Sequence, residues 1–374
     1  MARYRFDEIA ENSIEKRKPL PEDKDRYIGL EHLDPGSLVV SRWGAEVAPI
    51  GVKLVMKKGD VLFGRRRAYQ KKVAIAPFDG IFSAHGMVLR PRKEIISEKL
   101  FPFFISSDYF LNSAISISVG SLSPTINWQD LKELTFSIPP MDKQDKIADV
   151  FISMHELKEA YVRLLDATEE LVKLRFLEIF GDMKTNPFGW EQSTIGECCT
   201  LKSGTTLPIE VENEGGPIPY VKVGDMNYPG NERYIVTSSR YVSEATAEKK
   251  LFEVGSVLFP KRGGAISTNK KRMTKLPVCA DLNVMGVSSN GKLLPEYLLA
   301  YFDMIDLGAL ADGSSVPQIN NKNIAPLVIS IPPMEEQEKF STFIEQSDKL
   351  KFVVQNSLEK LNDSIQAFTN HVFS

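Results

Sequence analysis

The sequence has few cysteines, no long apolar run and none of the common enzyme signatures. Its 374 residues include three cysteines, Cys198, Cys199 and Cys279, without a Cys-x-x-Cys pair, which disfavours a disulfide framework and a thiolate zinc site. No run of about eighteen uncharged apolar residues occurs, and the N-terminus lacks the apolar core of a secretion signal. We therefore expect a cytoplasmic protein that does not enter a membrane.

The enzyme signatures that are missing include GxxxxGK[ST], HExxH, GxSxG and GxGxxG. These patterns build phosphate-binding loops, zinc sites, nucleophile turns and dinucleotide sites, respectively. The sequence therefore predicts no catalytic residue and no metal site in this chain.

An internal repeat is the most informative feature that is present. Ser137–Met141 has the sequence SIPPM, and the same five letters return 193 residues later at Ser330–Met334. A drift of the offset to 196 aligns Gly59–Phe63 with Gly255–Phe259. A period of this length is too long for a solenoid or propeller unit, so the repeat predicts two domains of similar fold.

Each half divides at its Pro-Pro dipeptide. The prolines favour an extended chain before them, and the acid-rich turn that follows favours a helix N-terminus. Apolar or small residues then recur with heptad spacing, which is typical of helices that pack lengthwise. In the first helix they are Val150, Met154, Leu157, Tyr161, Leu164, Thr168 and Leu171, and in the second Val354, Leu358, Leu361, Ile365, Phe368 and Val372.

The segments before each Pro-Pro show short apolar runs between Gly-, Pro- and Asn-rich turns, as mixed domains do. The expected strands are Leu38–Val40, Val61–Phe63, Val73–Ala76, Pro219–Val223, Tyr234–Val236 and Ser256–Phe259, and the expected short helices lie at Glu98–Phe104, at Glu296–Phe302 and after an N-cap at Asn127. We predict an α+β fold with pseudo-twofold internal duplication: two similar mixed α/β domains, 1–137 and 184–330, separated by two long antiparallel coiled-coil helices, 138–183 and 331–374.

The net charge of −3 hides opposite signs in different segments. Residues 1–137 carry +4 and residues 184–330 carry 0, whereas the helical segments 138–183 and 331–374 carry −4 and −3. Basic residues cluster after corresponding strands, as Arg65, Arg66, Arg67, Lys71 and Lys72 in the first domain and Lys261, Arg262, Lys270, Lys271 and Arg272 in the second. A single basic run is usually a solvated surface, but two runs at matched places favour binding to DNA phosphates and base edges.

The organisation as a whole resembles the DNA-specificity subunit of type I restriction–modification enzymes. The resemblance spans the chain and rests on SPTINWQDLKELTFSIPPMDKQDKIADVF and VPQINNKNIAPLVISIPPMEEQEKFSTFI, which are similar to the Pro-Pro-Leu-x-Glu-Gln boundary of that family. The segment from Gly189-Trp190 to Ile195-Gly196 is similar to the start of the second domain. Met141 and Met334 stand where Leu is usual.

The resemblance implies that the two globular segments are target recognition domains, each reading one half of a split site in double-stranded DNA. It also implies that the helices dock two methyltransferase subunits, and that restriction subunits join through these. S-adenosylmethionine, ATP and Mg²⁺ are expected on the partner subunits and no cofactor in this chain. The residues implied at the docking and helix-boundary positions are Pro139, Pro140, Gln144, Pro332, Pro333 and Gln337.

Two other functions stay open on the sequence. A single-chain DNA-modifying enzyme would bind S-adenosylmethionine or Mg²⁺ by itself, and no motif for either is visible. A coiled-coil adaptor would use its domains to bind protein, and a mobility-shift assay with DNA would distinguish it from the specificity subunit.

Overall fold

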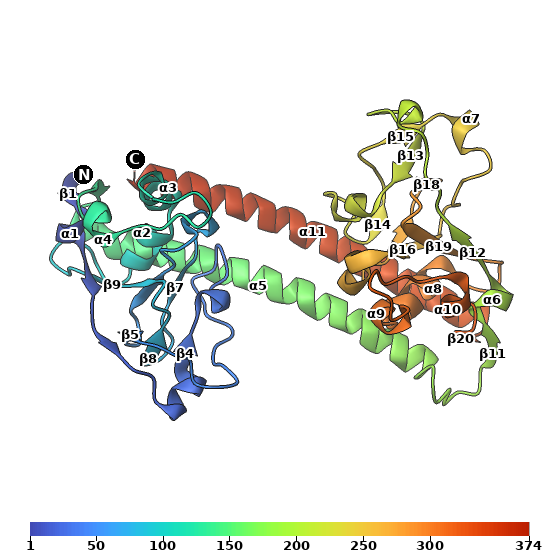
Figure 1. Cartoon of the computed structure of the whole chain (residues 1–374), viewed down its shortest axis with the longest axis horizontal. Coiled ribbons are helices and arrows are strands. Elements are labelled where there is room, and N and C mark those ends of the chain that lie inside the picture. Colours follow the sequence, from blue (N-terminus) through green and yellow to red (C-terminus); the bar gives the residue numbers. More distant parts are fainter. Residues whose placement is uncertain (374) are drawn as a thin grey trace. The chain divides into compact units, whose positions relative to one another are not determined.

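The computed structural model describes residues 1–373 and has an α+β fold. Two long helices connect the globular parts of the chain. The chain divides into unit 1, which contains Met1–Arg163 and the residues from Gln355 onward, and unit 2, Leu164–Val354. Helix α5 (Met141–Phe180) begins in unit 1 and ends in unit 2, whereas α11 (Met334–Phe373) begins in unit 2 and ends in unit 1 (Figure 1). Each unit therefore consists of a globular part and one half of each long helix.

Unit 1 contains two four-stranded sheets and a separate strand pair. The first sheet has the antiparallel order β2 (Ala10–Ser13), β9 (Met87–Pro91), β6 (Val61–Phe63), β7 (Val73–Ile75). The second has the order β3 (Lys16–Arg17), β5 (Lys53–Met56), β8 (Gly80–Phe82), β4 (Tyr27–Ile28), in which β4 and β8 are parallel. Strand β1 (Ala2–Arg5) pairs with β10 (Thr135–Ile138), which leads directly into Pro139 and Pro140.

The core of unit 1 follows the alternation of side chains along these strands. Val61 and Phe63 of β6 face the helices, whereas Leu62 between them faces the second sheet. The helices are α1 (Phe6–Ile9), α2 (Phe101–Ser106), α3 (Asp108–Ser116) and α4 (Trp128–Leu131). Phe151 of α5 and Phe373 of α11 are buried in the same core, so both long helices complete unit 1.

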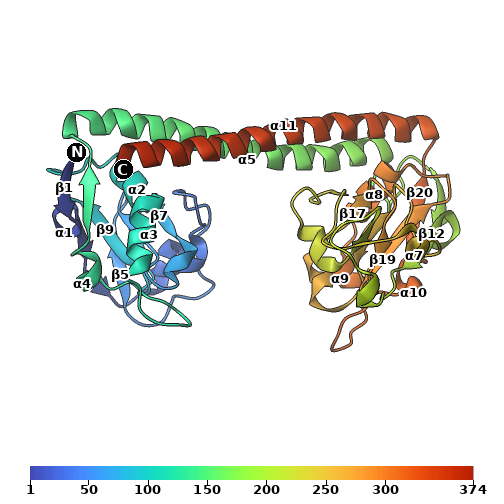
Figure 2. The same cartoon turned by 90° about the horizontal axis from the view of Figure 1, so that it is seen from above.

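Unit 2 has a five-stranded sheet, a three-stranded sheet and a strand pair. The larger sheet has the order β12 (Cys199–Ser203), β19 (Val284–Ser289), β16 (Val257–Pro260), β17 (Arg272–Thr274), β14 (Tyr234–Ile235). The smaller has the order β15 (Tyr241–Val242), β13 (Ile218–Val221), β18 (Cys279–Ala280), and β11 (Glu191–Thr194) pairs with β20 (Val328–Ile331). The short helices are α6 (Ile195–Cys198), α7 (Glu244–Ala247), α8 (Pro295–Asp303), α9 (Leu307–Leu310) and α10 (Asn321–Ile324). Helix α8 lies against the larger sheet (Figure 2).

The predicted helix starts are confirmed, because α5 and α11 begin at Met141 and Met334, directly after the prolines. The heptad positions predicted for α11 face inward: Val354 and Val372 are buried. The heptad positions predicted for α5 are half wrong: Val150, Leu157, Leu164 and Leu171 are 41%, 44%, 40% and 51% exposed, whereas Thr168 is buried and Met154 and Tyr161 are partly buried. The buried face of α5 carries Ala148, Phe151, Thr168, Val172 and Phe176. Helix α5 therefore has two apolar stripes, and only one of them packs inside the units.

The helix halves pack together in each unit. In unit 1 the rings of Phe151 and Phe368 are 4.9 Å apart. In unit 2, Phe176 packs against Phe340 at 5.6 Å, and Lys351 forms an ion pair with Glu169 at 3.5 Å. In unit 2 the higher number on one helix thus pairs with the lower number on the other, so the two halves run in opposite directions there.

Two local predictions also differ from the structure. Leu38–Val40 is not a strand: a single backbone bond joins it to β7, from Ile75 N–H to the Leu38 carbonyl at 2.9 Å. Asn127 precedes α4 as expected, but its side chain accepts no capping hydrogen bond. Within residues 1–373, no helix is both long and apolar enough to cross a membrane.

Candidate nucleic-acid interface

The basic loop of unit 1, residues 64–72, is held in place by its backbone. It leaves β6 after Phe63 and contains a 3-10 turn at Ala68–Gln70. Ile126 N–H donates to the Arg65 carbonyl at 3.0 Å, and Arg67 N–H donates to the Pro124 carbonyl at 2.8 Å. The Ser-Pro-Thr-Ile-Asn segment, which contains the N-cap position predicted at Asn127, therefore lies directly beside the arginines.

The side chains of this loop differ in how much free charge they offer. Arg66 and Arg67 are exposed and Arg65 is half-buried, and within the described residues none of the three forms an ion pair with a carboxylate. In contrast, Lys71 forms an ion pair with Asp108, and Lys72 donates to the Leu30 carbonyl at 2.6 Å. The charge that a ligand could reach is that of the three arginines.

The basic loop of unit 2, residues 261–271, makes the same backbone contacts. Ile319 N–H donates to the Lys261 carbonyl at 2.9 Å, and Gly263 N–H donates to the Pro317 carbonyl at 2.8 Å. Arg262 pairs with Gln318 in an isolated bridge, just as Arg66 pairs with Thr125. The two loops thus leave corresponding strands and are framed by the two Pro-x-Ile-Asn segments in the same way.

The basic side chains of unit 2 lie at different depths. Arg262 is exposed, Lys261 donates to Ser203 Oγ at 2.9 Å, and Lys270 contacts Asn227 Oδ1. Burial, together with the nearby charge of Arg262, lowers the pKa of Lys261.

Lys271 and Arg272 lie below this surface. Lys271 is 5% exposed and donates to Asn269 Oδ1 at 2.8 Å and to the Ile305 carbonyl at 2.7 Å. Burial lowers its pKa to about 8. Arg272 is half-buried and donates to the Lys271 carbonyl at 2.8 Å. Neither side chain is free to meet a phosphate in this conformation.

Gln144 and Gln337, which the family resemblance places at the docking boundary, are buried inside the two units. We call them the clasp glutamines, because each one hydrogen-bonds the start of a long helix to a loop. Gln144 accepts from Ser97 N–H at 2.6 Å and donates to the carbonyls of Ile95 and Pro139 at 2.8 and 2.9 Å. In unit 2 the acceptor and donor groups of Gln337 repeat this pattern with Leu294 N–H at 2.7 Å and the carbonyls of Lys292 and Pro332 at 3.1 and 2.9 Å. These hydrogen bonds tie each helix to the loop before α2 or α8. Because each glutamine is 1% exposed, it offers no surface to a partner.

A buried charge cluster joins the globular part of unit 2 to α11. Arg233 lies between Asp303 at 3.6 Å and Asp348 at 3.7 Å, and Tyr234 donates to Asp348. Burial raises the pKa of Asp303. Two guanidinium nitrogens of Arg233 have no hydrogen-bond partner. No short sequence spacing links these residues, so sequence reasoning missed the cluster.

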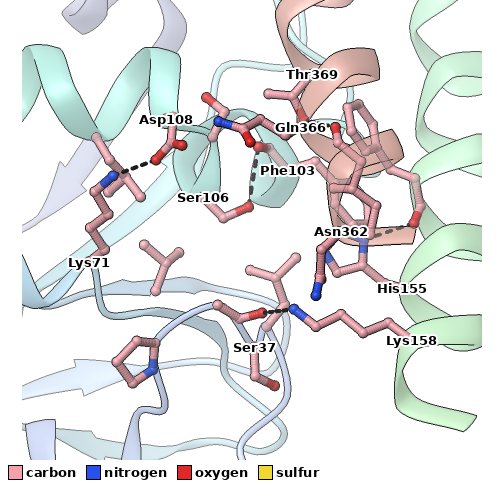
Figure 3. A pocket seen from close by; sticks show the side chains of 18 of the residues that line it. Ser37, Lys71, Phe103, Ser106, Asp108, His155, Lys158, Asn362, Gln366 and Thr369 are labelled. Carbon is pink, nitrogen blue, oxygen red and sulfur yellow. Dashed lines mark hydrogen bonds and ion pairs between the residues drawn. The ribbon is translucent and has the colours of Figure 1, made fainter. Parts of the chain in front are cut away.

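Unit 1 has a cavity of about 440 Å³ where unit 2 has this cluster (Figure 3). Leu38 and Arg233 hold the same place, since their carbonyls accept from Ile75 and Met273, the neighbours of Val61 and Val257 in the sheets. His155 likewise corresponds to Asp348, because each lies eleven residues after its clasp glutamine. Leu38 is smaller than Arg233 and carries no charge for His155 to pair with. Lys158, Asn362 and the Lys71–Asp108 ion pair border the space that remains, and burial lowers the pKa of His155.

The described residues hold no group of three or more His, Cys, Asp or Glu side chains that could bind a metal ion. All three cysteines are buried, and burial raises the pKa of their thiols. A raised pKa keeps a thiol in its unreactive protonated form.

The family model for the type I restriction modification DNA specificity domain matches residues 51–159 and 187–362, more than half of the chain. The chain belongs to this family. Among its relatives, the specificity subunit of the type I restriction enzyme MjaIX from Methanocaldococcus jannaschii is 25% identical over 280 residues. That match covers 68% of this chain and 63% of the relative, so the chain spans less than two thirds of MjaIX.

Solved structures of the specificity family share the fold. The S subunit of a type I restriction–modification system from M. genitalium has a TM-score of 0.59 at 15% identity, with 100% of this chain and 96% of that chain covered. A chain from a structure that addresses complex assembly and conformational transition of the type I R-M system has a TM-score of 0.59 at 20% identity, with 99% and 97% covered. At these identities the likeness concerns the fold alone.

Proposed function

We propose that this chain is the sequence-reading, non-catalytic subunit of a type I restriction–modification enzyme. Its basic loops bind double-stranded DNA at two half-sites, with Arg65, Arg66 and Arg67 at one and Lys261, Arg262 and Lys270 at the other. Methyltransferase and restriction subunits bring the chemistry, together with S-adenosylmethionine, ATP and Mg²⁺.

One observation carries this proposal: cationic side chains that have no carboxylate partner within residues 1–373 stand on matched loops that are framed by matched backbone contacts. Arg66 and Arg262 are both exposed, and both bridge to the middle residue of a Pro-x-Ile segment. A fixed backbone with free guanidinium groups suits phosphates and guanine edges, since little order is lost on binding. Family membership supports the same function.

The helices supply the rest of the proposal. We assign α5 and α11 as an antiparallel coiled-coil spacer between two target recognition domains that arose by duplication, with segments 1–137, 138–183, 184–330 and 331–374. A helix of 40 residues is about 60 Å long, so the two half-sites are separated by a gap that is not read.

The outward stripe of α5 is the place where we expect methyltransferase subunits to dock. Val150, Leu157, Leu164 and Leu171 are exposed and spaced by seven residues, which puts them on one face of the helix. Apolar stripes of this kind bind a partner helix. This assignment replaces the docking role of Gln144 and Gln337.

The salt dependence of DNA binding tests the function. Binding of the mapped site by the chain with its methyltransferase subunits is measured between about 50 and 200 mM salt. Arg66→Ala/Arg67→Ala should weaken binding and reduce the slope of log K against log salt by about 2, because each phosphate contact contributes about 0.9.

The matched control is Lys93→Ala, which removes an exposed lysine that forms an ion pair with Glu98. Lys93 follows the end of β9, whereas the basic loop lies at its start, where Met87 pairs with Phe63. An unchanged slope in the arginine variant removes this loop from the DNA contact. If no DNA binding occurs while protein partners are retained, the chain is a coiled-coil adaptor. Binding of S-adenosylmethionine by the purified chain alone would indicate a DNA-modifying enzyme.

A further inference from the structure

An apolar loop tip stands beside the arginines of unit 1. The loop Val119–Thr125 is closed at its base by two backbone hydrogen bonds, Val119 N–H to the Thr125 carbonyl at 3.0 Å and Thr125 N–H to the Val119 carbonyl at 2.9 Å. Between them Leu122 is 93% exposed, and Val119 itself is 64% exposed. A leucine this exposed on a loop of small residues contributes nothing to the folded core.

The same contacts that hold the basic loop fix the position of this tip. Pro124 accepts from Arg67 N–H, and Thr125 bridges to Arg66. Tyr69, on the 3-10 turn of the basic loop, is 56% exposed. Three exposed apolar side chains therefore adjoin unpaired arginines on one framed surface.

The charge around the tip identifies what covers it. Segment 117–127 contains no charged residue, and its neighbours Arg66 and Arg67 have no carboxylate partner within residues 1–373. A protein partner with an apolar face would leave these guanidinium groups to be desolvated without a counter-charge. Duplex DNA offers both phosphates for the arginines and a base step for an apolar wedge, a combination that DNA-bending proteins use.

We propose that Leu122 is a wedge that enters a base step in the half-site bound by unit 1, with Arg66 and Arg67 on the flanking phosphates. The proposal rests on the proposed function and adds a specificity-determining residue to it. Partial unstacking costs least at flexible steps, so the wedge selects DNA by deformability as well as by base edges.

Unit 2 does not carry this wedge. Asp312 N–H donates to the Gln318 carbonyl at 3.0 Å, as Val119 N–H does to Thr125, and the position that corresponds to Leu122 is Ser315. The Asp312 carboxylate accepts from Ser314 Oγ at 2.7 Å, and the apolar residue of this tip is Val316, which is 46% exposed and one position further along than Leu122. The unit 2 tip therefore carries a carboxylate and a shorter, β-branched side chain, and we expect only the half-site of unit 1 to be unstacked.

The test uses the full chain in complex with its methyltransferase subunits and duplexes that carry 2-aminopurine at successive positions of each mapped half-site. Methyltransferases flip their target base out of the stack, so a rise at the target adenine of either half-site does not count for the wedge. We expect fluorescence to rise on binding at one further step, in the half-site bound by unit 1, and at no further step in the other half-site. Leu122→Ser, which installs the residue found in unit 2, should abolish the rise and weaken binding about tenfold, since losing a buried leucine side chain is partly offset by the unstacking avoided. Leu122→Met should retain the rise.

Val254→Ser is the matched control, because Val254 is 57% exposed and lies before the start of β16, whereas Lys261 follows its end. This variant should change neither the fluorescence rise nor the DNA affinity. Cognate binding without a fluorescence change at any step other than the target adenines, or a further rise that Leu122→Ser leaves intact, overturns the wedge and leaves the proposed function standing. Loss of methyltransferase subunits from the Leu122→Ser complex, with normal DNA affinity, also overturns it and identifies the tip as a protein contact. Failure of the complex to bind DNA at all overturns the proposed function and the wedge with it.

Discussion

Replacing Gln144 should destabilise unit 1 and leave unit 2 unchanged. Its side chain makes three hydrogen bonds to backbone groups and is 1% exposed. Each bond contributes about 1 kcal/mol net, and the groups left behind would be buried without partners, so we expect Gln144→Ala to cost about 3 kcal/mol. For a unit of this size that loss lowers the melting temperature by about 6 to 12 °C.

Calorimetry gives the total loss in the free energy of unfolding, and amide hydrogen exchange shows which unit is destabilised. In Gln144→Ala the amides of residues 93–100 should exchange faster and those of residues 290–297 should not, whereas Gln337→Ala should reverse this pattern. Gln144→Met separates hydrogen bonding from packing, because it keeps the volume and removes all three bonds. Gln355→Ala, an exposed glutamine on α11, controls for the change in helix propensity.

A free energy of unfolding within about 0.5 kcal/mol of the parent in Gln144→Ala would refute this reasoning, because such values are typical of surface positions. If the same variant also lost its methyltransferase subunits, the glutamine would be a docking residue, as the family resemblance implies.

Three further predictions address the helices and the buried charges. Inserting four residues after Thr168 lengthens α5 by about 6 Å, nearly two base-pair steps; methylation mapping should show the same half-sites with a wider gap, and an unchanged gap contradicts the spacer. Leu157→Ser/Leu164→Ser should reduce copurification of methyltransferase subunits with less than about 0.5 kcal/mol lost in stability, whereas normal copurification removes the stripe from docking. Because burial lowers the pKa of Lys271 from 10.5 to about 8, the unfolded chain binds more protons between these values, so stability rises with pH there; calorimetry should show a flatter rise in Lys271→Met, and an equally steep one excludes this lysine as the cause.

The local signals predicted the long helices better than their packing. A Pro-Pro dipeptide followed by carboxylates acts on the adjacent backbone, and both helices begin where it predicts. The face of α5 that packs inward could not be chosen from spacing, because Leu164 and Leu171 belong to one apolar stripe while Thr168 and Val172 belong to another. Periodicity identifies a stripe but does not say what covers it.

The candidate site shows the same limit. Two basic runs after matched strands predicted two corresponding loops, and the backbone contacts of Arg66 and Arg262 do correspond. Depth could not be predicted: Lys271 is buried and Lys270 is not, although they are neighbours in the sequence. The cluster of Arg233, Asp303 and Asp348 depends on long-range folding and left no motif to recognise.

The core of unit 1 closes with residues that the ribosome makes long after the rest of that unit. Phe373 packs against Phe104, Tyr109 and Phe151, yet the roughly 190 residues between Arg163 and Gln355 must be synthesised first, which takes about 10 to 40 s. Throughout that time the nascent chain presents an uncovered aromatic surface that chaperones and proteases can bind. A product released before α11 is complete would therefore lack the ring that closes this core and would keep the aromatic surface exposed.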